Sequence, residues 1–224
     1  MPHTTRFFEE LGRGDAELIL DSLLEFPEVT SDVDRVLSYV GETHLDCVWD
    51  YLGRRLDHPK EGIEGTRYKA APHRFHRLVV TLSSDAALAV AKVRAWFDKT
   101  STLFSYYGGR VLTAVFPQMT EAFAATLLSE VAKGRPEDAK FVVAVMQNYR
   151  GEAETHGILK ELLRKFPEDE DVKDGVARSI RNTGVVHGEF GFVENIRDKK
   201  ALLEPWLEED ETVAQFARQQ VAEM

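Results

Sequence analysis

The residues best suited to binding chemistry are basic side chains gathered in one stretch of an acidic chain. The 224 residues hold 28 Lys and Arg against 38 Asp and Glu, a net charge of −10. No acidic residue occurs between Glu64 and Asp85, so positive potential can accumulate there. The side chains that form this candidate patch, in the tract and just before it, are Arg54, Arg55, Arg67, Lys69, Arg74, His76 and Arg77.

Such a patch can bind a phosphate, an acidic segment of a partner protein, or single-stranded nucleic acid stacked on Tyr68 and Phe75. The alternative is that its cations pair with the protein's own surplus carboxylates, which contributes little to stability. A chain of this net charge repels phosphate backbones, so nucleic acid is a less suitable ligand than protein.

The spacing of His73 and His76 is the nearest approach to a metal site. An H-x-x-H motif at a helix start places both imidazoles on one side, as a zinc site would need. No cysteine or carboxylate completes the set at a usual spacing, so we predict surface histidines and no metal. The only cysteine, Cys47, lies among hydrophobic residues and is predicted to be an inert core thiol.

The familiar catalytic motifs are absent from the sequence. Gly108 and Gly109 lack the following Lys-Ser/Thr of a phosphate-binding loop. There is no nucleophile elbow and no metalloprotease helix with paired histidines. The acidic residues 168–171 stand at a predicted helix start, where carboxylates favour the helix dipole without a bound cation. We therefore expect no enzymatic activity and no cofactor.

A glycine-rich segment, residues 182–192, interrupts the helical pattern a second time. Three glycines and two phenylalanines in these eleven residues predict the end of the preceding helix. The segment is either a turn whose phenylalanines fill the core, or a recognition loop that presents His187, Glu189 and Phe190.

The elements that position these residues are all predicted to be helices, with breaks about every 12–18 residues and no strand pattern. Caps and breakers separate the helices, and residues 58–71 are predicted to form a loop. The expected helices cover residues 6–11, 15–26, 31–41, 43–56, 72–82, 85–99, 102–116, 120–133, 136–149, 152–166, 168–181, 192–207 and 211–224.

Paired in order, these helices give about seven antiparallel hairpins, which start at intervals of roughly 24–41 residues. Short turns make each helix pack on its neighbours in sequence, which predicts a right-handed α-solenoid of the HEAT or armadillo kind. A compact all-helical bundle is the alternative. We expect one domain over residues 1–224; because the apolar stripe of the last helix needs a cover, this domain could be part of a longer protein.

The setting predicted for this chain is the cytoplasm. A single cysteine fits a reducing compartment, and the acidic residues among the first 26 are not tolerated in a secretory signal. No apolar run reaches the length of about 18 residues that a membrane span needs.

Two stretches resemble known helical modules. Residues 182–192, together with 204–210 and 213–217, resemble the closing repeats of bacterial HEAT-like modules, and residues 68–78 are similar to a hairpin entry in such modules. Some of these modules are attached to, or encoded beside, effector and NTPase parts of antiviral defence proteins. The resemblance implies a scaffold or sensor surface that binds a protein partner or a neighbouring domain.

A different class of HEAT-like protein binds nucleic acid or excises bases as a DNA glycosylase. Such proteins need an extended basic groove lined by aromatic side chains. Four aromatic residues of this chain fall mostly on apolar helical faces, which predicts that they belong to the core. They are Trp49, Trp96, Tyr106 and Tyr107.

Overall fold

The computed structural model describes residues 10–57, 68–72, 74–99, 102–149, 151–182 and 188–224, with side chains for all of these except 102–105 and 188–195. The described residues form helices and turns and contain no strand, as predicted. None of the described helices is long and apolar enough to cross a membrane. The contacts group the chain into two compact units, residues 1–118 and 119–224. The single solenoid domain expected from the sequence stays a prediction.

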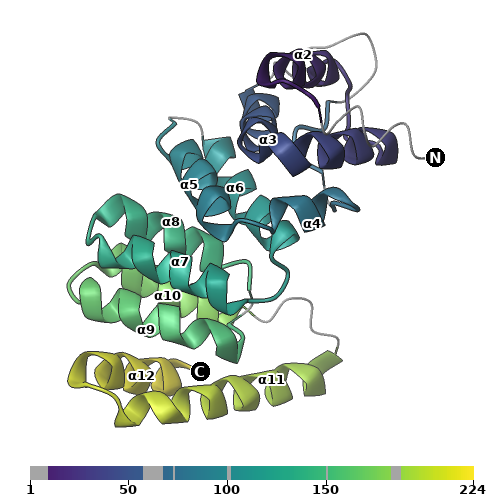
Figure 1. Ribbon diagram of the computed structural model, residues 1–224. Helices are drawn as coiled ribbons and strands as arrows, with labels where there is room; N and C mark the ends of the chain where they lie inside the picture. Colours follow the sequence, from purple (N-terminus) through teal and green to yellow (C-terminus); the bar gives the residue numbers. More distant parts are fainter. Residues whose placement is uncertain (1–9, 58–67, 73, 100–101, 150, 183–187) are drawn as a thin grey trace. The chain divides into compact units, whose positions relative to one another are not determined.

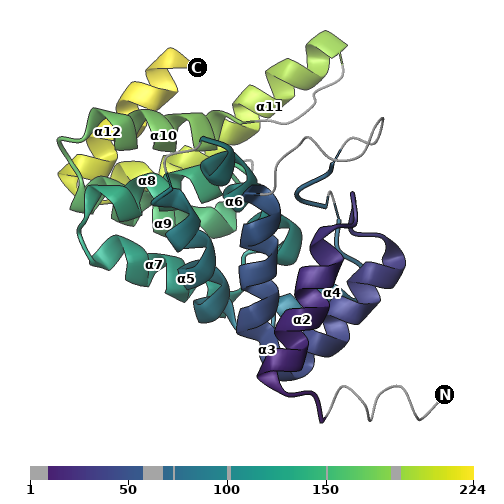
Figure 2. The ribbon, with the colours of Figure 1, turned by 90° about the horizontal axis from the view of Figure 1, so that it is seen from above.

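A long kinked helix, α3 (Ser31–Asp57), organises the first unit (Figure 1). It packs against α2 (Arg13–Leu24), α4 (Leu78–Leu82) and α5 (Ala86–Phe97), and Figure 2 shows α2 and α4 beside it from a second direction. α6 (Thr102–Val115) packs against α4 and α5. Burying apolar side chains of these helices supplies the main stabilisation of the unit. Its core includes Leu20, Leu37, Val48, Trp49, Leu82, Val90, Trp96 and Leu112.

The break predicted between residues 41 and 43 lies at His44, where two helices join across a kink within α3. His44 has a non-helical backbone, with φ −133° and ψ 54°, and its Nε2 lies 2.7 Å from the carbonyl oxygen of Leu11. Gly41 lies against α4, where an added Cβ would come within 2.7 Å of the Thr81 side chain. The glycine therefore serves close packing against α4, and the kink between the two helices follows three residues later.

In the second unit, α7 (Glu121–Ala132) and α8 (Pro136–Met146) form a hairpin, and α9 (His156–Lys165) and α10 (Glu170–Arg181) form another. α9 packs against α7 and α10 packs against α8, so the second hairpin lies against the first (Figure 1). Gly134 makes the turn between α7 and α8 with a φ of 71°, a left-handed conformation that suits glycine after a helix.

Side-chain caps fix several helix starts where the sequence predicted them. Asp85, Thr120, Asp169 and Asp210 each accept a hydrogen bond from a backbone N–H three residues later. The residue before α8, Arg135, makes no such capping hydrogen bond.

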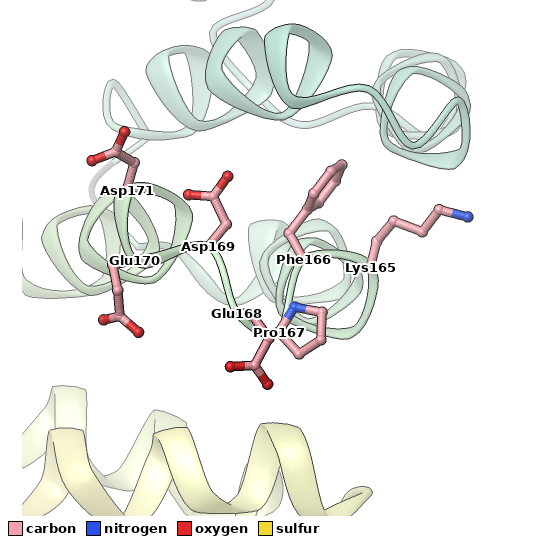
Figure 3. Close-up of a pocket in the computed structure, with 7 residues that line it drawn as sticks. All are labelled: Lys165, Phe166, Pro167, Glu168, Asp169, Glu170 and Asp171. Atoms are coloured by element: carbon pink, nitrogen blue, oxygen red, sulfur yellow. The ribbon is translucent and has the colours of Figure 1, made fainter.

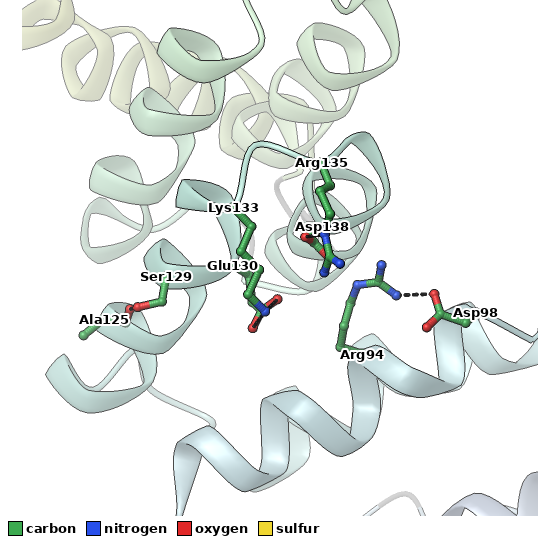
Figure 4. A network of polar contacts seen from close by, with 8 residues as sticks. All are labelled: Arg94, Asp98, Ala125, Ser129, Glu130, Lys133, Arg135 and Asp138. Carbon is green, nitrogen blue, oxygen red and sulfur yellow. Dashed lines mark hydrogen bonds and ion pairs between the residues drawn. The ribbon is translucent and has the colours of Figure 1, made fainter.

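Arg135, the residue before α8, binds Asp138 with two contacts, Nε to Oδ2 at 2.6 Å and Nη2 to Oδ1 at 3.0 Å (Figure 4). Asp138 is fully buried, and this bidentate pairing compensates for the loss of its hydration. Figure 4 also draws the ion pair of Arg94, in α5, with Asp98, the residue after α5.

The last helices differ from the prediction at the glycine-rich segment. α11 (Gly188–Leu203) includes residues 188–192, which were expected to be non-helical, while residues 183–187 lie outside the described part. A glycine costs a helix only about 1 kcal/mol relative to alanine. α11 contacts η2 (Glu204–Glu208) and α12 (Glu211–Glu223).

The apolar stripe of α12 is covered within its own unit. Val213, Phe216 and Ala217 are buried, and the helix contacts α9, η2 and α11. The cover that the sequence pattern required is thus supplied by these neighbouring helices.

A buried polar contact ties α9 to η2. Trp206 donates from Nε1 to Nδ1 of His156 at 3.0 Å, and the two rings meet edge to face at 5.1 Å. Because Nδ1 accepts, the imidazole is neutral and carries its proton on Nε2. Lys199, also buried, donates to the carbonyl oxygen of Gly151 at 3.3 Å. Burial lowers the pKa of His156, and the positive charge of Lys199 lowers it further.

We predict that the second unit loses stability in mild acid because of His156. Its folded pKa is depressed, so the unfolded chain takes up a proton first as the pH falls below about 6.5, and the free energy of unfolding falls with it. This stability is present above that pH. Urea unfolding between pH 8 and pH 5 measures the slope, and His156→Gln, which does not titrate, should flatten it. An equal slope in both proteins would contradict the assignment.

Candidate binding surface

Residues 68–78 are held against α3 at two points, and the first is the buried Arg55. Its side chain is fully buried and donates to the backbone carbonyl oxygens of Lys69 at 2.8 Å and Ala70 at 3.2 Å. It also reaches the turn after α2, donating to the carbonyl oxygens of Phe26 at 3.0 Å and Pro27 at 3.4 Å. One guanidinium therefore joins two segments that are distant in sequence.

Two tyrosines complete the surroundings of Arg55. Its guanidinium carbon lies 4.5 Å from the ring centroid of Tyr68 and 5.8 Å from that of Tyr51. The two phenols donate to backbone carbonyl oxygens of α2, Tyr68 to Leu24 and Tyr51 to Leu23, each at 3.2 Å. Burial raises the pKa of Tyr68 to about 12, so this phenol stays a neutral donor. Arg55, expected from the sequence in an exposed patch, instead has a structural role.

The second point of attachment is the buried carboxylate of Asp34, in the first turn of α3. Its Oδ1 accepts from the backbone N–H of Arg77 at 2.8 Å and of Leu78 at 3.2 Å, and its Oδ2 accepts from that of His76 at 3.0 Å. Only 2% of the residue is exposed. Backbone N–H groups bonded to a side chain are not available to a helix, so the helix predicted over 72–82 starts only at Leu78.

Between these anchors, Arg74, His76 and Arg77 are exposed; we call these three residues the basic turn. Phe75, between the first two, is buried and fixes the turn against the protein. The side chains of the basic turn make no hydrogen bond or ion pair within the described part of the chain. Val80, one helical turn beyond Arg77, is 74% exposed and adds an apolar contact to the same area.

Two further members of the predicted patch do not add to this surface. Arg54 pairs with Asp21, and Lys69 pairs with Glu28 at 2.5 Å, a hydrogen bond that lowers the pKa of the Glu28 carboxyl. The pairing with the protein's own carboxylates applies to these two cations. Arg67 lies outside the described residues.

The predicted histidine and loop sites are only partly described. His73 and His187 lie outside the described residues. Glu189 and Phe190 fall in the first turn of α11, and their side chains are not described. No group of three or more possible metal ligands occurs in the part of the chain that was described.

The aromatic residues near the basic turn are poorly placed for stacking. Phe75 is buried, and one face of the half-buried Tyr68 ring is covered by the Arg55 guanidinium. Trp49 and Trp96 are core residues, as predicted. The prediction is wrong for Tyr106, which is 58% exposed and whose hydroxyl accepts from Arg110 at 2.8 Å.

The acidic residues at the start of α10 lie around an open pocket without forming a cation site (Figure 3). Asp169 caps the helix by accepting from the Val172 N–H at 3.1 Å, and Glu170 pairs with Lys173 at 2.8 Å. Figure 3 shows the carboxylates of Glu170 and Asp171 pointing to opposite sides. These local contacts account for the cluster, in line with the helix-dipole interpretation.

Comparisons with protein-family models, with curated proteins and with solved structures find no match to this chain. The class of this protein must therefore be argued from its own surface. The described residue that sequence reasoning missed is Asp34. A signal was present, because Asp34 shares a helix face with Leu37 and Gly41, three and seven residues later, and a carboxylate on an apolar face needs buried donors.

Replacing Arg55 should destabilise the first unit strongly. Arg55→Met keeps much of the side-chain volume but leaves four part-buried carbonyl oxygens without this donor, and we expect a loss of about 3 kcal/mol. Urea unfolding measures it. The matched control is Arg54→Met, which removes an exposed ion pair and should cost less than about 1 kcal/mol. Equal losses in the two variants would argue against the anchoring role of Arg55.

Asp34→Asn should loosen the basic turn with little change in shape. One carboxylate oxygen becomes an N–H donor that faces backbone N–H groups, and we expect a loss of about 2 kcal/mol. Hydrogen exchange should become faster at the amides of His76, Arg77 and Leu78. Asp32→Asn is the control, since Asp32 is exposed and forms an ion pair with Arg35. Unchanged protection of the three amides would show that Asp34 does not hold the turn.

Proposed function

We propose that this chain is a non-enzymatic helical module of the HEAT-like kind that binds a protein partner through the basic turn. The observation that carries the proposal is a contrast within one short segment. The backbone is fixed by Asp34 and the buried Phe75, while the charged side chains point to solvent without partners in the described structure. Fixed backbone and unpaired charge together reduce the cost of ordering on binding.

The partner surface that fits this turn is acidic. Complementary charge steers the encounter and excludes partners of the wrong sign. Arginine is enriched in the energetically important parts of protein interfaces, and an exposed aliphatic residue such as Val80 offers a small apolar contact at their centre.

A protein partner is favoured over nucleic acid by the state of the neighbouring aromatic residues. Stacking on aromatic faces supplies much of the affinity for single strands, and Tyr68 and Phe75 are both engaged inside the protein. The glycosylase-like alternative would need a basic groove that extends well beyond the basic turn. Stacked hairpins in the second unit support a helical-repeat scaffold, and the defence-associated sensor role belongs to this same proposal.

A charge reversal tests the proposal. Arg74→Glu combined with Arg77→Glu should weaken binding of an acidic peptide by about tenfold or more, because attraction becomes repulsion. Fluorescence anisotropy measures the affinity, with single-stranded DNA of the same charge as the competing probe. The control pair is Lys140→Glu with Arg197→Glu, two exposed residues of the second unit, which changes the net charge equally.

The two probes separate the hypotheses. A protein partner is supported if the peptide binds more tightly than the DNA and if only the variant of the basic turn loses this binding. Tighter binding of the DNA with a steep salt dependence would replace it with the nucleic-acid function. Equal peptide affinity in the wild type and the variant would remove the basic turn from consideration as a site.

A further inference from the structure

We propose that the basic turn binds a second copy of this chain, at an acidic corner formed by Glu204, Leu207 and Glu208. The inference rests on the proposed function, namely that the basic turn binds protein, and it names the partner. The argument comes from the exposed faces of two short helices, α4 in the first unit and η2 in the second.

The acidic corner results from the geometry of η2. In a 3₁₀-helix, residues three apart lie on the same side. Leu203 and Trp206 are buried, which places Glu204 and Leu207 together on an outer side. Leu207 is 41% exposed, an unusual position for leucine in this protein. Glu208, next to it, is also exposed.

The two glutamates of this corner are unpaired within the described residues. Glu204 and Glu208 make no ion pair or hydrogen bond with side chains of the described residues. The acids that follow are engaged: Glu209 pairs with Lys160 at 2.5 Å, and Asp210 pairs with Arg164 at 2.7 Å. The glutamates without a partner in the described structure thus precede and follow the exposed leucine in sequence, while Glu209 and Asp210 pair with α9.

The basic turn and the acidic corner are complementary in their charge and in their exposed apolar residues. Each has one exposed aliphatic residue, Val80 or Leu207, beside charges that have no partner within the described structure, and the signs are opposite. An apolar contact flanked by charge pairs is the usual arrangement of a small interface. Because one surface lies on each unit, the contact between copies is heterologous and can repeat from one copy to the next.

The net charge of −10 limits the strength of this contact and gives it a characteristic salt dependence. At low ionic strength, like-charged copies repel over long distances. At physiological ionic strength, charges more than about 8 Å apart are largely screened, whereas pairs in direct contact still attract. In concentrated salt these exposed pairs weaken too. Self-association is therefore expected to be reversible and strongest at intermediate salt.

Charge-swap variants test this contact by sedimentation velocity over a range of concentrations and salt. The wild type should show a weight-average sedimentation coefficient that rises with concentration. Arg74→Glu with Arg77→Glu, and separately Glu204→Arg with Glu208→Arg, should each stay monomeric. An equimolar mixture of the two variants should associate again, because the intact corner of one meets the intact turn of the other. A misfolded variant could not be rescued in this way.

The outcomes separate this inference from the proposed function. A wild type that stays monomeric at every salt concentration, variants that still associate, or a mixture that fails to associate would each overturn it. If the wild type is monomeric while the basic turn still binds the acidic peptide, only the identity of the partner is wrong. If the basic turn binds neither a second copy of the chain nor the acidic peptide, both proposals fail. The control pair Lys140→Glu with Arg197→Glu should associate like the wild type.

Discussion

Two buried charges on α3 determine where residues 68–78 lie. Arg55 near one end of the helix and Asp34 near the other each satisfy their charge with backbone groups of that segment. A buried ion without partners would cost several kcal/mol, so the segment cannot leave either end without a large penalty. The position of α4, which packs on α3 and α6, and the direction of the basic turn both follow from these contacts.

The same arrangement explains why some cations of the tract are engaged and others are available. Arg55 donates its hydrogen bonds to backbone carbonyl oxygens. Arg54 and Lys69 form ion pairs with carboxylates of α2 and of the turn that follows it. The backbone of the basic turn faces Asp34 through its N–H groups, which leaves its side chains directed away from that carboxylate. Burial of one acid thus leaves the neighbouring cations without a partner in the described structure.

Much of the helical pattern was predictable, because it depends on local signals. Asp85, Thr120, Asp169 and Asp210 cap helices by contacts with residues three positions away, which a sequence displays directly. The failures depend on distant contacts. The false helix over 72–82 is prevented by a carboxylate more than forty residues earlier.

The site was predictable only in its general location. The sequence indicates that residues 67–77 are basic, but it does not reveal which cations are paired, because pairing depends on tertiary neighbours. Arg55 illustrates the limit: it lies on the same helix face as Tyr51 and Leu52, which indicates burial, yet by composition it belongs to the patch. The packing pattern was the better guide, since a charge on an apolar face must find buried partners. Tyr106 shows the converse, an aromatic residue on an apolar face that remains exposed.

Buried charges are a costly way to fix a segment, and apolar residues of similar volume often stabilise a protein more. The advantage of the buried charges here is that they fix the orientation of residues 68–78. An apolar side chain at position 34 could bury Phe75 from many orientations of the segment, whereas three N–H bonds to one carboxylate permit few. The proposed binding through Arg74 and Arg77 needs both charges at fixed positions, because exposed ion pairs contribute little unless they form together. The contacts of residues 68–78 therefore fix the direction of this segment at some cost in stability, and the proposed binding function depends on that fixed direction.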